Sequence, residues 1–115
     1  MSDVLTEAVQ RVSHVPGVRG ALVVEAEAGL SVVAEVAAET DGDAVAALSA
    51  ALFRRTAEAA AIGGFGTLES LHLEADGGHV LVAGGPDLVI VVIAEDDAQL
   101  GRIRVETLRA AEALR

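Results

Sequence analysis

Two histidines and a glutamate come nearest, among the residues of this sequence, to a metal-binding pattern. His72, Glu74 and His79 flank the turn residues 76–78, which read Asp-Gly-Gly. Imidazole and carboxylate groups are common metal ligands, and these three would converge if the flanking segments pair as a hairpin. Their spacing matches no recurring zinc pattern, and the chain contains no cysteine. We therefore expect surface or interface polar groups here, with no metal.

The glycine-rich run at residues 63–66, Gly-Gly-Phe-Gly, raises the possibility of a phosphate cradle. It lacks the G-K-[ST] ending of a P-loop, and it does not follow a strand as a dinucleotide-binding loop does. A helix end with a flexible connector explains these glycines better. The chain also has no G-x-S-x-G motif, no lysine and no tyrosine. We expect a protein that is not an enzyme and that needs no cofactor.

Arg54 and Arg55 are the only adjacent basic pair in the chain, whose formal net charge is -10. Arginine is enriched among the residues that dominate protein interfaces. We predict that Phe53, Arg54, Arg55 and Glu58 contact a protein partner. The alternative is that the arginines are solvated, or that they pair with Glu58 or with acidic residues of another subunit.

The charge balance restricts the classes of partner. Eighteen acidic side chains against eight basic ones disfavour binding to nucleic acid and to anionic membranes. No stretch is long and apolar enough to span a bilayer, and the acidic, amphipathic N-terminus is unlike a signal peptide. We expect a cytoplasmic protein without membrane insertion. Its 115 residues suit a single domain covering residues 1–115.

The stretch from Asp43 to Ile62 must organise the rest of the chain. It is rich in alanine, it can be capped by Thr40, Asp41 or Asp43, and glycines follow it. One apolar face is predicted to lie on a sheet, and it consists of Val45, Leu48, Leu52, Ala59 and Ile62. The opposite face is also apolar, and it consists of Ala46, Ala47, Ala50, Phe53, Ala57 and Ala61. A helix apolar on both sides is covered on both sides, so we predict a dimer built on the second face.

Shorter elements surround this helix. We predict a first helix that ends before Pro16 and a last helix that opens at Asp96. Apolar patterning predicts five strands, at residues 20–26, 30–37, 68–74, 79–83 and 88–94. Leu71 and Leu73 should face inwards. The last strand is apolar without alternation, so it should lie in the middle of the sheet with both faces covered.

This order of elements resembles the roadblock (dynein light chain) family. Three segments carry the likeness. The first is residues 16–24, PGVRGALVV, running on to Gly29-Leu30. The second is the alanine-rich helix with its glycine connector, and the third is residues 100–104, LGRIR. Together they span essentially the whole chain. One difference is the turn Ala28-Gly29, where the family more often has Asp-Gly.

The resemblance implies an α/β (α+β sandwich) fold. It would have a five-stranded antiparallel sheet with one helix on one face and two on the other, in the order α-β-β-α-β-β-β-α. It also implies a homodimer in which the middle helices pack together and the third strands pair. Here those are residues 43–62 and 68–74, and the strand would contribute Leu68, Ser70, His72 and Glu74.

The resemblance further implies a function in binding. Bacterial members regulate a small Ras-like GTPase without a catalytic centre of their own. Other members are light chains or scaffold subunits, so a scaffold without a GTPase partner is the alternative. A small-molecule sensor of similar architecture is a third reading. Whether the protein would activate, inhibit or only position a GTPase stays open.

Overall fold

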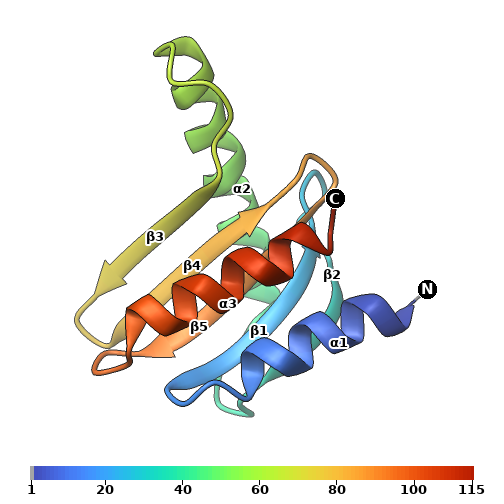
Figure 1. Ribbon diagram of the computed structural model, residues 1–115, viewed down its shortest axis with the longest axis vertical. Helices are drawn as coiled ribbons and strands as arrows, with labels where there is room; N and C mark the ends of the chain where they lie inside the picture. Colours follow the sequence, from blue (N-terminus) through green and yellow to red (C-terminus); the bar gives the residue numbers. More distant parts are fainter. Residues whose placement is uncertain (1) are drawn as a thin grey trace.

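The computed structural model describes the backbone of residues 2–115 and the side chains of residues 4–115. Three helices and five strands follow one another in the predicted order (Figure 1). Their bounds are α1 Ser2–Ser13, β1 Val18–Glu25, β2 Ser31–Val36, α2 Gly42–Ile62, β3 Ser70–Ala75, β4 Gly78–Gly84, β5 Leu88–Glu95 and α3 Leu100–Glu112.

The strands form one sheet in the order β2-β1-β5-β4-β3, and all neighbours are antiparallel. Helices α1 and α3 lie side by side over one face, and α2 lies on the other (Figure 1). This is the predicted five-stranded sandwich. The prediction for the last strand is also confirmed, because β5 is the central strand and Val89 to Val92 are fully buried.

Two apolar cores hold the layers together, one on each side of the sheet. The core under α1 and α3 includes Val9, Val12, Val23, Ile90 and Ile103. The core under α2 includes Leu22, Ala46, Ala50, Phe53, Val82 and Val91. Successive residues of a strand point to opposite faces, so the three central strands β1, β5 and β4 contribute to both cores.

Helix α2 begins and ends as its sequence predicts. The side chain of Asp41 accepts a hydrogen bond from the amide of Ala44 at 3.1 Å. After Ile62 the amides of Gly63 and Phe65 donate back into the last turn, and Gly64 has a positive φ of 81°. Neither α2 nor another helix in the described part of the chain combines the length and apolar character needed to cross a bilayer.

Helix α3 begins at Leu100, four residues later than Asp96, where the sequence pattern placed its start. The amide of Glu95 still pairs with the carbonyl of Gly17 at 2.8 Å, and the amide of Ala98 closes a turn onto Glu95. The chain therefore needs residues 96–99 to reverse its direction before a helix can lie back over the sheet.

Candidate protein-interaction surface

The orientation predicted for α2 is wrong. Ala46 and Ala50 are each 1% exposed and Phe53 is 6% exposed, and all three pack on the sheet. Small alanine side chains let the helix backbone come close to the strands, and Phe53 fills the remaining space. Ala46 and Ala50 therefore face this chain's own sheet and cannot contact a second copy. Phe53 also faces this chain's own sheet, so it cannot make the predicted contact with a protein partner.

The stripe predicted to lie on the sheet faces outwards instead. Leu48 is 72% exposed, Leu52 is 40% exposed and Ile62 is 87% exposed. Val45 alone of this set packs partly against the core, while Ala59 is exposed. The prediction that this helix is apolar on two opposite sides is confirmed. The sequence pattern could not say which side lies inwards, because both sides are apolar.

Strand β3 extends this outward apolar stripe across the sheet. Leu71 and Leu73 pair with Val82 and Val80 and share the α2 face, as their alternation predicted, yet Leu73 is 41% exposed. Helix α2 does not reach far enough to cover it. A hollow of about 100 Å³ lies among these side chains. We call this set the apolar surface: Leu48, Leu52, Leu71, Leu73 and Val80.

Strand β3 is also a free edge. Within the part of the chain that the structure describes, it pairs with β4 on one side only, so its other side presents unpaired backbone groups. Exposed edges of this kind are templates for pairing with a further strand. Leu68 and Ser70, predicted at a strand interface, are half-buried at the start of this segment, while His72 and Glu74 are exposed.

The second half of α2 extends beyond the sheet (Figure 1). No residue of the helix after Phe53 is buried. A broad hollow of about 830 Å³ lies beside this half, and Ala57, Ala61 and Leu68 are among its lining residues. Ala47 is exposed on another flank, where its backbone lies close to the turn at Gly29.

Arg54, Arg55 and Glu58 are all exposed on this helix. Among the side chains that the structure describes, neither arginine forms an ion pair with a carboxylate. Arg55 follows Leu52 by three residues, so it lies on the same side of the helix as the apolar surface. The guanidinium group of Arg55 is therefore available beside an uncovered apolar region, whereas Arg54 projects from another side of the helix.

His72, Glu74 and His79 share one face of the β3–β4 hairpin, the face on which α3 packs. Nε2 of His72 lies 3.0 Å from Nδ1 of His79, which is buried. Within residues 4–115 no third histidine, aspartate or glutamate joins them as a possible metal ligand.

Comparison with known proteins agrees with this architecture. The family model of the Roadblock/LC7 domain matches residues 4–94. An uncharacterized protein of Methanocaldococcus jannaschii is 31% identical over 99 residues, which is 86% of each chain. The gliding protein MglB of Thermus thermophilus superposes with a TM-score of 0.84 at 21% identity, covering 97% of this chain and 86% of that one. A structure of MglB in a tetrameric arrangement gives 0.85 at 22% identity, with coverage of 97% and 85%.

At these identities the two MglB structures establish the fold alone. The family is established separately, because its model covers most of the chain and the archaeal relative aligns over nearly its full length. The protein belongs to the Roadblock/LC7 domain family.

Proposed function

We propose that this protein is a non-catalytic, homodimeric regulator or adaptor that binds a small Ras-like GTPase and influences its nucleotide cycle. The observation that carries the proposal is the apolar surface beside the free edge of β3. Exposed apolar regions of this kind mark protein interfaces. Family membership supplies the class of partner.

A second copy of the chain is the proposed cover of the apolar surface. Leu48 and Leu52 would pack against the same residues of the other α2, and β3 would pair with its counterpart. Residues Ser70, His72 and Glu74 would then lie along a seam between two sheets. Ala57 and Ala61 would border the paired helices. This arrangement would satisfy the unpaired backbone groups of the edge and remove the leucines from water together.

Arg54 and Arg55 are the proposed contacts with the GTPase. A dimer built on α2 would bring two such pairs to one surface of an otherwise acidic protein. Arginine forms forked hydrogen bonds with carboxylates, so an acidic switch region would be a suitable target. These residues would bind and position the partner, and no group of this chain would need to take part in hydrolysis.

The test is capture on the immobilised full chain, once with a non-hydrolysable GTP analogue and once with GDP, from lysate of the source organism. We expect a small GTPase, identified by mass spectrometry, to be retained in one nucleotide state only. Arg54→Glu with Arg55→Glu should abolish that retention. Arg102→Glu with Arg104→Glu, on α3, is the matched control and should leave it unchanged.

Retention of other proteins equally in both nucleotide states would replace this proposal with the scaffold function. Loss of GTPase retention in the α3 control as well would show that overall charge, and not the α2 arginines, governs capture.

A further inference from the structure

The groove between α1 and α3 gathers positive charge on the face of the sheet opposite α2. Arg11 on α1, His14 in the turn just after that helix, and Arg102 and Arg109 on α3 line one hollow of about 370 Å³. Three of the eight basic residues in a chain of net charge -10 therefore meet at one place. Volumes of this order accommodate small-molecule ligands.

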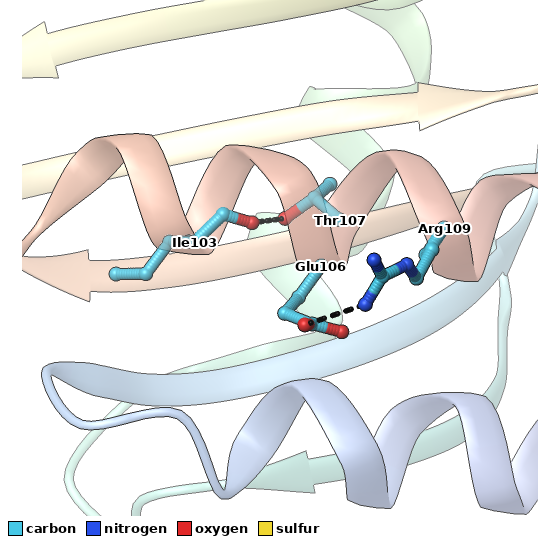
Figure 2. A network of polar contacts seen from close by, with 4 residues as sticks. All are labelled: Ile103, Glu106, Thr107 and Arg109. Atoms are coloured by element: carbon cyan, nitrogen blue, oxygen red, sulfur yellow. Dashed lines mark hydrogen bonds and ion pairs between the residues drawn. The ribbon is translucent and has the colours of Figure 1, made fainter.

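Helical spacing explains how the arginines converge. Arg102, Glu106 and Arg109 are four and three residues apart, so they project from the same side of α3. Arg11 lies in the last turn of α1, and His14 lies in the turn that follows this helix. Figure 2 shows Glu106 and Arg109 on the side of α3 that faces α1. Within residues 4–115, neither Arg11 nor Arg102 forms an ion pair with a carboxylate.

Among the side chains of residues 4–115, Glu106 is the only acidic one that lines the hollow. Its Oε2 accepts a hydrogen bond from Nη1 of Arg109 at 3.2 Å (Figure 2). Its Oε1 is buried and has no hydrogen-bond partner among the described residues. A buried acceptor without a donor costs free energy, so this atom favours a ligand that brings a proton to it.

These two features specify complementary parts of one ligand. Uncompensated guanidinium groups favour an oxyanion, with which arginine forms paired hydrogen bonds. The unpaired Oε1 favours an oxyanion that also carries an O–H group. A phosphate that keeps one proton near neutral pH has both parts. Sulfate has the same shape and charge but no proton to donate, and simple carboxylates also lack one at that pH.

We propose that the α1–α3 groove binds a phosphate group, held by Arg11, Arg102 and Arg109 and selected over sulfate by Glu106. The site lies on the opposite side of the sheet from the apolar surface, so it does not depend on dimer formation or on a GTPase partner. A ligand here would contact both outer helices at once and would stabilise their packing.

The experiment is a titration of the full-length, isotope-labelled protein followed by NMR, with calorimetry for affinities. Sodium phosphate, glycerol 3-phosphate and sodium sulfate are added separately at equal ionic strength. We expect saturable shifts at residues 11, 14, 102 and 109, with phosphate binding about tenfold more tightly than sulfate. At neutral pH the free phosphate ion keeps a proton that glycerol 3-phosphate has largely lost. We therefore expect the free ion to bind more tightly than the monoester.

Two variants test the assigned roles. Arg11→Gln with Arg102→Gln should weaken phosphate binding by about tenfold or more. The matched control, Arg54→Gln with Arg55→Gln, removes equal charge from the other face and should not change it. Glu106→Gln should bring phosphate and sulfate to nearly equal affinity, because an amide can also donate to sulfate. A substitution that only loosened the packing of the two helices would leave the ratio of phosphate affinity to sulfate affinity unchanged.

Four results would overturn the proposal. The first is the absence of saturable shifts at the groove residues. The second is equal weakening of phosphate binding in the α2 control. The third is a wild-type protein that binds sulfate as tightly as phosphate. The fourth is binding of a hexaglutamate peptide in the groove without binding of either phosphate probe, which would assign the surface to an acidic protein segment.

Discussion

His72 on β3 and His79 on β4 are joined through their ring nitrogens, Nε2 of the first lying 3.0 Å from Nδ1 of the second. Nε2 of His79 lies 3.3 Å from the carbonyl oxygen of Asp96, which can only accept. In the tautomer that suits this carbonyl, Nε2 of His79 carries the proton, and its Nδ1 accepts from Nε2–H of His72. This chain of two hydrogen bonds ties the edge strand to the turn that precedes α3.

Removing either histidine should destabilise the fold unequally. His79→Ala should lower the free energy of unfolding by about 2–3 kcal/mol, because it removes a buried ring and both hydrogen bonds. His72→Ala should cost about 1 kcal/mol, because buried Nδ1 loses its donor. Urea unfolding followed by circular dichroism measures both values. Glu74→Ala, at an exposed position of the same strand, is the control, and an equal loss there would contradict the assigned role.

Charge placed on the apolar surface should prevent self-association. Leu48→Glu with Leu52→Glu puts two carboxylates on the outward side of α2, where burial against a second copy would leave them unsolvated. We expect this variant to sediment as a folded monomer while the wild type sediments as a dimer. Leu30→Glu changes another exposed leucine, beside the β1–β2 turn, and should remain dimeric. A dimeric double variant would exclude this surface as the interface.

Two glycine-to-alanine changes should act in opposite directions. At Gly84, an added Cβ would lie 2.5 Å from the carbonyl oxygen of Leu88 and 2.7 Å from Cα of Val89. Neither backbone atom can move freely, so Gly84→Ala should cost about 2–3 kcal/mol of stability. At Gly101, in the first turn of α3, the added methyl group meets nothing within 4 Å. Gly101→Ala should therefore raise stability by about 0.5–1 kcal/mol, measured by the same unfolding assay.

The two phenylalanines of the chain should differ sharply in their effect on stability. Phe53 is 6% exposed and fills the space between α2 and the sheet, whereas Phe65 is 84% exposed. Phe53→Ala should lower the free energy of unfolding by about 3–5 kcal/mol, since it leaves a cavity in the α2 core. Phe65→Ala should change it by less than about 0.5 kcal/mol. Thermal unfolding at one protein concentration compares them, and similar midpoints would contradict the observed packing.

The sequence by itself determined the types and order of the elements. Apolar patterning identified five strands, and the unbroken apolar run of residues 88–94 identified the central strand, because a strand covered on both faces tolerates such a pattern. Three candidate caps, Thr40, Asp41 and Asp43, placed the start of α2 to within a few residues, and the glycines after Ile62 marked its end, because local hydrogen bonding decides where a helix begins and stops. The structure selects Asp41 as the cap.

Only the tertiary structure decided which side of α2 lies inwards. Both sides are apolar, so periodicity alone leaves the choice open, and close approach of the backbone to the sheet selected Ala46 and Ala50 over the larger leucines. The α1–α3 groove was also decided by the tertiary structure alone. Arg11 and Arg102 are distant in the sequence, and they meet only because α1 and α3 pack side by side on one face of the sheet. Local patterns specify elements, whereas surfaces built from several elements depend on how those elements pack.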